Sequence, residues 1–263
     1  MTKGRVLIVA GSDPSGGAGI QADIKTVTCL GGYAMSAITA LTAQNTQGVF
    51  GIHAVPVDFI AQQIRLCLDD IGADVVKTGM LHSAEVIEAI AAHVPLEVPL
   101  VVDPVMVAKG GSLLLQTQAL AALTEILLPR AAVITPNLPE AELLLGSAIS
   151  GEAAMIEAAK ELLRFGAQAV LLKGGHSDRP IITDVLQIRG AAPITLTALR
   201  VDTRHTHGTG CTMASAIATG LAQKLSLEDA VRRAHAYVQA AIASAPGLGH
   251  GHGPLGHLTL ENI

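Results

Sequence analysis

The chain has 263 residues, of which 50% are hydrophobic and 15% charged, so it can bury a large core, and general disorder is excluded. Its formal net charge is −5, without the clustered Lys and Arg of a nucleic-acid-binding surface, so no nucleic acid is expected as a partner. The longest uncharged stretch, 26–57, contains a polar run and few strongly apolar residues, so no membrane-spanning helix is expected either.

Apolar runs of strand length alternate with segments of helical period. In chain order the first half predicts strand 5–10, helix 18–30, extended segments 33–42 and 51–55, helix 57–71, strand 74–78, helix 83–92, strand 100–103 and helix 116–127. The second half predicts strand 132–135, helices 139–145 and 151–165, strand 169–173, a hairpin over 181–199, and helices 208–223 and 226–244. This alternation predicts an α/β fold with a doubly wound, mostly parallel central sheet and helices on both faces.

No linker, repeat or low-complexity segment divides the sequence, so residues 1–263 are expected to form one domain. The first strand begins near the N-terminus without an apolar signal segment. Three widely spaced cysteines, Cys29, Cys67 and Cys211, favour reduced thiols over a disulfide framework. A cytoplasmic location is therefore expected.

A glycine-rich segment, 11–19, follows the first predicted strand. It lacks the Lys-Ser/Thr of a Walker loop. Residues 17–22 match the dinucleotide fingerprint, but no acidic residue follows between Asp23 and Asp58, so NAD binding is a weak alternative. The segment indicates either a flexible strand-to-helix turn or a place where a ligand approaches the backbone.

A second glycine-containing segment, 206–212, precedes a helix rich in small residues. Backbone N–H groups at a helix start, beside the positive end of the dipole, form an anion site. Cys211 lies there, and a thiol in this position is expected to have a lowered pKa. The alternative is a simple cap on a helix that packs closely against the sheet.

Polar residues follow three further strands, where ligands bind in doubly wound sheets. Asp103, Asn137 and Glu140 could hold a hard cation through oxygen or water ligands, and Lys173 could neutralise phosphate charge. The alternatives are a helix cap for Asn137, a helix-dipole partner for Glu140 and a surface position for Lys173.

The glycine-rich C-terminal segment carries His250, His252 and His257. Their spacing fits no standard zinc site, and no cysteine accompanies them. A flexible or loosely packed tail is expected instead.

Taken together, the motifs resemble one family. The whole chain is similar to the bacterial hydroxymethylpyrimidine/phosphomethylpyrimidine kinases of thiamine biosynthesis, which belong to the ribokinase-like superfamily. Seven blocks carry the resemblance in order: 10–23, 40–46, 77–81, 103–106, 135–140, 172–176 and 206–212. The resemblance implies the ribokinase-like fold, ATP and Mg²⁺ as cofactors, a cytoplasmic homodimer, and transfer of phosphate first to a hydroxymethylpyrimidine and then to its monophosphate.

The resemblance also implies a substrate pocket. Gly11, Asp23, Gln44 and Met80 occupy the matching positions and would shape the pyrimidine site. Their identities favour the pyrimidine branch over the main alternative, a pyridoxal/pyridoxine kinase on the same fold, with Gln44 and Met80 as the discriminating residues.

For the phosphate side, the resemblance implies that Asn137 and Glu140 organise Mg²⁺ with Asp103 nearby, and that Lys173 faces the ATP phosphates. Asn137 and Thr209 join Lys173 among the nucleotide-binding residues.

Gly208, Thr209 and Gly210 would form the anion hole, with Cys211 as a thiolate base for the first transfer. Arg204-His205 departs from the family pattern just before this segment, on the adenosine side. A non-catalytic pyrimidine-binding protein is a further alternative, disfavoured because Lys173, Glu140 and Cys211 are all present.

Overall fold

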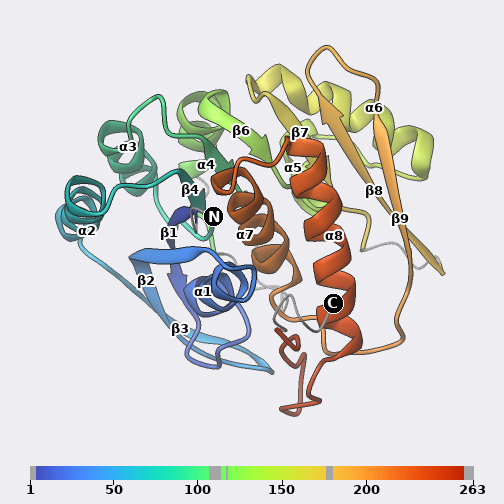
Figure 1. Cartoon of the computed structure of the whole chain (residues 1–263), viewed down its shortest axis with the longest axis horizontal. Helices are drawn as coiled ribbons and strands as arrows, with labels where there is room; N and C mark the ends of the chain where they lie inside the picture. The colour runs from blue at the N-terminus through green and yellow to red at the C-terminus, as the bar shows by residue number, and fades with distance from the viewer. Residues whose placement is uncertain (1–3, 107–113, 117, 176–179, 258–263) are drawn as a thin grey trace.

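The computed structural model describes residues 4–106, 114–116, 118–175 and 180–257 (Figure 1). A nine-stranded sheet forms its centre, in the order β3-β2-β1-β4-β5-β6-β7-β8-β9. The strands are β1 (Arg5–Ser12), β2 (Tyr33–Asn45), β3 (Gly48–Ala54), β4 (Val75–Thr78), β5 (Leu100–Val102), β6 (Ala131–Ile134), β7 (Ala169–Leu172), β8 (Ile181–Ile188) and β9 (Ile194–Leu199). Six neighbouring strands of the sheet pair in parallel, in the order β2-β1-β4-β5-β6-β7. The other strands pair antiparallel at the two edges, β3 at one and β8 with β9 at the other.

Helices cover both faces of the sheet. They are α1 (Gly19–Cys29), α2 (Val57–Asp70), α3 (Ala84–His93), α4 (Ala119–Ala122), α5 (Leu138–Leu145), α6 (Glu152–Leu162), α7 (Thr209–Ala222) and α8 (Leu227–Ala243). A π-helical turn, η1 (Leu123–Leu127), and a 3-10 turn, η2 (Leu128–Arg130), continue α4, and a second 3-10 turn, η3 (Leu163–Phe165), continues α6. The prediction of a doubly wound α/β fold with a mostly parallel sheet is confirmed.

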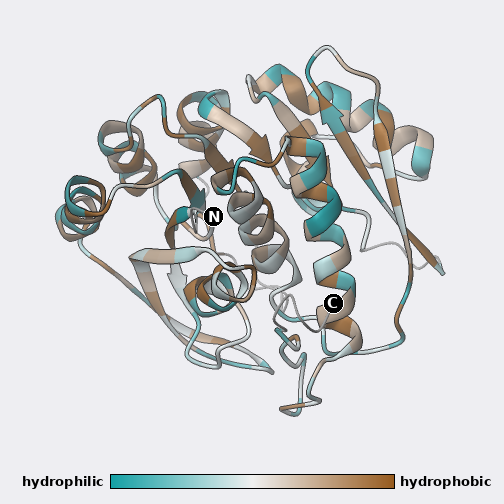
Figure 2. Cartoon of the chain, viewed as in Figure 1, coloured by the Kyte–Doolittle hydropathy of each residue, from teal (hydrophilic) through white to brown (hydrophobic). Residues whose placement is uncertain are grey.

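Alternation along the strands produces two cores. Leu7 and Val9 of β1 pack against α2 and α3 on one face, whereas Val6 and Ile8 pack against α1, α7 and α8 on the other. Successive side chains of a strand point to opposite faces, so a run of apolar residues fills both cores. Figure 2 shows the strands as mainly hydrophobic and α8 as hydrophilic on its visible face. The packed sheet thus holds the ends of its parallel strands in fixed positions.

The hairpin β2–β3 differs from its sequence-based prediction. The sequence predicted extended segments 33–42 and 51–55, but β2 continues to Asn45 and β3 begins at Gly48. Pairing with β3 extends the ladder as far as Asn45 and Gly48, so the polar residues lie on the hairpin and at its turn. Tertiary pairing outweighs the local polar composition here.

The C-terminal segment corrects another expectation, because residues 245–257 pack against the rest of the chain. The His252 N–H donates to the Thr46 carbonyl at 2.7 Å, and the Gly256 N–H donates to the Ala241 carbonyl at 2.9 Å. Within the described ranges, no group of three or more His, Cys, Asp or Glu side chains is placed to hold a metal ion. None of the helices in the described part of the chain has the length and apolar character needed to span a bilayer.

Candidate active site

Several of the predicted site residues lie at the carboxyl ends of the parallel strands. Asp103 follows β5, Asn137 follows β6 and Lys173 follows β7. Because parallel strands end at the same edge of the sheet, these residues meet there. Backbone pairing joins Asn137 to Lys173, and the Thr135 hydroxyl donates to Asp103 Oδ1 at 2.9 Å.

Lys173 and Asp103 form an ion pair at this edge. Lys173 Nζ lies 3.0 Å from Asp103 Oδ1, and the two side chains are 13% and 3% exposed. Burial acts to lower the pKa of Lys173, but the charges of Asp103 and Glu140 outweigh it and raise the pKa, so the ammonium stays protonated. A Cβ added at Gly210 would lie 3.3 Å from Nζ. The pair therefore sits directly against the start of α7.

The start of α7 has the geometry of an anion site. Gly208 is the N-cap residue, in the left-handed region at φ +85°, and a Cβ there would collide with the Gly17 carbonyl oxygen. Only glycine fits at this contact between the two glycine-containing segments. The first intrahelical bond is donated by Thr212, so the N–H groups of 209–211 have no acceptor within the helix. Gly208, Thr209 and Gly210 are thus brought together as expected, beside Lys173.

Cys211 does not have the lowered pKa that its position suggested. Burial raises its pKa to about 12, and the nearby charge of Lys77 offsets only part of this effect. The thiol is therefore neutral at physiological pH, which corrects the expectation of a thiolate. The helix dipole favours an anion at this place, but removal from water costs more.

A second ion pair lies beneath Cys211, and sequence analysis missed its lysine. Lys77, in β4, donates to both carboxylate oxygens of Asp23 at 2.8 Å, and the Ser215 hydroxyl donates to Asp23 Oδ1 at 2.7 Å. Both charged side chains are 0% exposed. This corrects the expectation that Asp23 shapes the pyrimidine pocket, because it has no surface for a ligand to touch. A lysine inside a predicted central strand, after two valines, was the available signal.

Asn137 and Glu140 begin helix α5 with a capping box. The Glu140 N–H donates to Asn137 Oδ1 at 2.9 Å, and the Asn137 N–H donates to Glu140 Oε2 at 2.8 Å. Burial raises the pKa of Glu140 to about 7; Lys173 opposes this shift and Asp103 adds to it. Both residues therefore act at the start of the helix, as the structural alternatives for them proposed. The capping box fixes the Glu140 carboxylate close to the Lys173–Asp103 pair.

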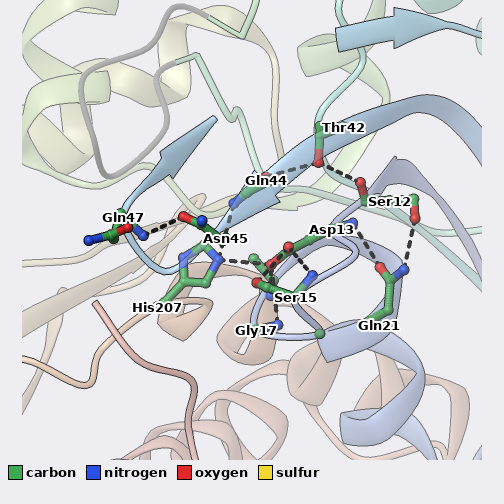
Figure 3. A network of polar contacts seen from close by, with 12 residues as sticks. Ser12, Asp13, Ser15, Gly17, Gln21, Thr42, Gln44, Asn45, Gln47 and His207 are labelled. Carbon is green, nitrogen blue, oxygen red and sulfur yellow. Dashed lines mark hydrogen bonds and ion pairs between the residues drawn. The ribbon is translucent and has the colours of Figure 1, made fainter. Parts of the chain in front are cut away.

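Two predicted pocket residues, Gly11 and Met80, lie in contact. A Cβ added at Gly11 would be 3.0 Å from Met80 Sδ, and the Thr39 hydroxyl holds the Met80 carbonyl at 2.6 Å. Gln44 lies further along β2, where its amide contacts Thr42 and His207 (Figure 3). The structure thus places Gln44 beside the glycine-rich turn after β1.

Asp13 and His207 complete this neighbourhood, and neither was singled out from the sequence. The Asp13 carboxylate organises the glycine-rich turn, and His207 Nε2 lies 2.8 Å from Asp13 Oδ2 (Figure 3). Asp13 lies in the family block 10–23 and His207 in the block 206–212. In both blocks the neighbouring glycines, and not these side chains, suggested the function. His176, which ends the block after β7, lies outside the described residues.

The arrangement brings together the groups that phosphoryl transfer requires. An ammonium and unpaired helix N–H groups stand side by side, with two carboxylates and an amide oxygen within the same edge. Such a transfer depends on positioning and charge neutralisation more than on covalent chemistry.

Comparison with known proteins agrees with this geometry. The family model described as phosphomethylpyrimidine kinase matches residues 13–256. The hydroxymethylpyrimidine/phosphomethylpyrimidine kinase of Bacillus subtilis is 45% identical over 98% of this chain and 96% of its own length. The thiamine biosynthesis bifunctional protein ThiED of Geobacter sulfurreducens is 55% identical over 97% of this chain, but this chain spans only 52% of that protein.

Among solved structures, the phosphomethylpyrimidine kinase of Clostridium difficile is similar with a TM-score of 0.78 and 40% identity, covering 91% of this chain and 100% of that one. The pyridoxal kinase of Staphylococcus aureus, in complex with AMP-PCP and pyridoxal, is similar with a TM-score of 0.88 and 36% identity, covering 99% and 95%. The match to the family model and the full-length identity to its curated members agree. The chain belongs to the phosphomethylpyrimidine kinase family.

Proposed function

We propose that the protein is a Mg-ATP-dependent kinase that phosphorylates 4-amino-5-hydroxymethyl-2-methylpyrimidine to its monophosphate, and then the monophosphate to the diphosphate. The observation that carries the proposal is the Lys173–Asp103 pair against the first turn of α7, in a chain of this family. The 45% identity to the Bacillus subtilis enzyme over nearly both full lengths supports the substrate.

The proposed role of Lys173 is to neutralise charge on the transferred phosphate. Its ammonium is protonated and partly exposed, and among the described residues its only ion-pair contact is to Asp103. The N–H groups of Thr209 and Gly210 lie beside it, free of intrahelical bonds. A preorganised donor of this kind contributes about 2.7–4 kcal/mol to a transition state.

Mg²⁺ is the proposed metal, and the side chains fit it. Asp103, Asn137 and Glu140 offer oxygen atoms, the ligands that Mg²⁺ prefers. The raised pKa of Glu140 marks a buried carboxylate that Lys173 compensates only in part, so an added cation is favoured there. Because the capping box already occupies the Asn137 and Glu140 oxygens, both residues would hold the ion through its waters. When bound, Mg²⁺ supplies neutralising charge for the phosphates.

Cys211 is proposed to line the anion hole. A neutral thiol cannot take a proton from the substrate alcohol as a thiolate would, and the pKa of about 12 keeps the thiol neutral in the free protein. The thiol is held by surroundings that include the Lys77–Asp23 pair and the Gly19 N–H. Its proposed contribution is shape at the point where α7 begins.

The alternative substrate class is vitamin B6 alcohols. It is favoured by the structural likeness to pyridoxal kinases, including the Staphylococcus aureus enzyme at a TM-score of 0.88. Gln44 favours the pyrimidine, because an aminopyrimidine presents an amine donor beside a ring-nitrogen acceptor, and an amide side chain can pair with both. Gly11 and Met80 would pack against either ring.

A cytoplasmic homodimer is the proposed state of the protein. Supporting it, β3 is an edge strand of the sheet and carries an exposed Phe50, while neighbouring α2 exposes Phe59 and Leu66. A second copy covering these residues would remove apolar surface from water. Light scattering of the purified chain measures its mass directly, and a monomer at micromolar concentration would contradict this part of the proposal.

The activity is tested by an ATP-consumption screen with four alcohols or phosphates: hydroxymethylpyrimidine, its monophosphate, pyridoxal and pyridoxine. We expect consumption with the first two, and product analysis should show the monophosphate before the diphosphate. Faster turnover of pyridoxal than of hydroxymethylpyrimidine would replace the main proposal by the alternative.

A further inference from the structure

His207 joins the glycine-rich turn, the β2–β3 hairpin and the start of α7 (Figure 3). Its Nε2 lies 2.8 Å from Asp13 Oδ2 and 3.2 Å from Gln44 Nε2. The side chain is 11% exposed, and a Cβ added at Gly17 would come within 2.4 Å of its Cδ2 atom. The imidazole is therefore held in one place, with the same nitrogen facing both Asp13 and Gln44.

The protonation of this nitrogen follows from Asp13. The Asp13 carboxylate accepts from the Ser15 N–H and hydroxyl at 2.9 and 2.7 Å, and from the N–H groups of Gly17 and Ala18 at 3.2 and 2.8 Å. Burial acts to raise the pKa of Asp13, but the bonds from His207 and Ser15 outweigh it and lower the pKa. Asp13 is therefore ionised and only accepts, so His207 Nε2 must carry a proton and donate.

The Gln44 amide must then present its oxygen to His207. With its nitrogen there, two N–H donors would face each other. The Thr42 hydroxyl shows the same conflict: its oxygen lies 2.9 Å from the Ser12 carbonyl and 3.1 Å from Gln44 Oε1, yet it has one proton. Turning the amide by 180° exchanges oxygen and nitrogen in nearly the same space and removes both conflicts. The single Nε2 proton of His207 then forms a three-centre bond, to Asp13 Oδ2 at 2.8 Å and to the amide oxygen placed 3.2 Å away, and the amide nitrogen donates to Thr42.

We propose that His207 is a positioning residue for substrate selection, because it fixes the orientation of the Gln44 amide through its Nε2–H. One lone pair of the amide oxygen and one N–H of its nitrogen then remain free. These are the acceptor and donor that complement the exocyclic amine and adjacent ring nitrogen of an aminopyrimidine. The inference rests on the proposed function and adds a second residue to its selectivity.

Without His207, only the Thr42 hydroxyl still orients the Gln44 amide, so the turned orientation becomes more populated. A turned amide presents donor to donor and acceptor to acceptor against the pyrimidine, and this mismatch leaves polar groups unpaired. A vitamin B6 ring has a phenolic oxygen in place of the amine, so it gains less from the fixed orientation. Loss of His207 is therefore expected to affect the pyrimidine more than pyridoxal.

The test is a double-mutant cycle of His207→Phe and Gln44→Leu, with kcat/KM measured for hydroxymethylpyrimidine and for pyridoxal. Phe keeps a planar ring against the glycine-rich turn but cannot donate. We expect His207→Phe alone to lower the pyrimidine-to-pyridoxal ratio by about tenfold. In the Gln44→Leu background the same change should leave the ratio unaltered. An equal change of the ratio in both backgrounds would overturn the inference.

Two controls separate positioning from a structural role. His207→Gln retains a side-chain donor and is expected to recover most of the lost selectivity, with KM for ATP near that of the parent. If His207→Phe instead raises KM for ATP equally with both alcohols and leaves the ratio unchanged, His207 acts only through the neighbouring anion hole, and the inference is wrong.

A readout independent of activity keeps the inference distinct from the proposed function. The side-chain NH₂ resonances of Gln44, assigned in an NMR spectrum by their loss in Gln44→Leu, should shift in His207→Phe. If the parent turns over neither alcohol, the proposed function fails, while this shift still reports the contact. Unshifted Gln44 resonances would overturn the contact itself.

Discussion

Two lysine–aspartate pairs flank the first turn of α7, and they differ in their access to solvent. Lys77 and Asp23 are both 0% exposed, and Ser215 adds a hydrogen bond to the carboxylate. Lys173 is 13% exposed and lies 3.0 Å from Asp103. The same residue types thus form a closed pair, Lys77–Asp23, within the core and an open pair, Lys173–Asp103, at the edge of the core. The open pair can exchange part of its interaction for a phosphate, whereas the closed pair cannot.

The largest effect is expected for stability, from Lys77→Met. Removing the lysine leaves the Asp23 carboxylate buried without its cation, which costs about 3–5 kcal/mol. Urea unfolding of the variant should show this loss in free energy. The double variant Lys77→Met with Asp23→Leu removes both charges and should recover much of it. A loss below about 1 kcal/mol for the single variant would mean that the closed pair resembles a surface pair.

For the open pair, the larger expected loss is in activity. Lys173→Met should lower kcat/KM by about 10²–10³-fold, because the phosphate loses a preorganised donor. Because Asp103 is 3% exposed and loses its cation, the melting temperature should also fall, but by less than in Lys77→Met, since the 13% exposure of the lysine lets water approach the pair. Lys160→Met serves as the control, because Lys160 is an exposed lysine with one carboxylate partner. Similar activity losses in both variants would remove Lys173 from the phosphate site.

Glu140 extends the comparison to the metal. Glu140→Gln keeps the hydrogen bonds of the capping box but removes a charge beside the open pair. We expect the apparent affinity for Mg²⁺ to fall by about 10–100-fold, as for other residues that orient metal ligands. Activity titrated against Mg²⁺ at saturating ATP measures it. The assignment is wrong if parent and variant coincide at limiting Mg²⁺.

Cys211 lies between the two pairs. A variant at this position tests whether the lysine of the closed pair keeps the thiol ionised as a base. The sequence predicted a thiolate base, whose loss would damage the first transfer by about 10²–10⁴-fold more than the second. The raised pKa of about 12 now predicts comparable, modest losses in Cys211→Ala. Separate assays with the alcohol and its monophosphate decide this. A selective loss of the first transfer would restore the base.

His257 offers a partly buried ionisable group, and the smallest effect. Burial, with the charge of Lys25 second, lowers its pKa from 6.5 to about 4, and Thr212 contacts its Nε2 at 3.1 Å. Between these values the unfolded chain binds a proton that the folded chain does not, so stability falls as the pH drops from 6.5 to 4.

Because His257 is partly exposed, we expect its contribution to be only about 1 kcal/mol. His257→Gln should remove that part of the pH dependence and leave stability at pH 8 nearly unchanged. Melting temperatures across this pH range provide the measurement. Parallel curves for parent and variant would contradict it.

The sequence by itself determined the layered α/β fold, because apolar periodicity is local and strand–helix alternation admits few topologies. It also marked Lys173, Asp103 and the glycines before α7, since strand ends and helix starts can be recognised from neighbouring residues. The sequence did not indicate that Asp13 and His207 form a contact, because the two residues are distant in the chain.

Only the tertiary structure decided the roles of Lys77, Asp23 and Cys211. Their charges depend on how completely the surrounding elements exclude water, and burial is a property of the assembled layers. The C-terminal segment followed the same rule: its glycine-rich composition predicted loose packing, yet contacts such as that of His252 with Thr46 hold it in place. Local sequence specifies which groups can act, whereas long-range packing fixes their charge and their partners.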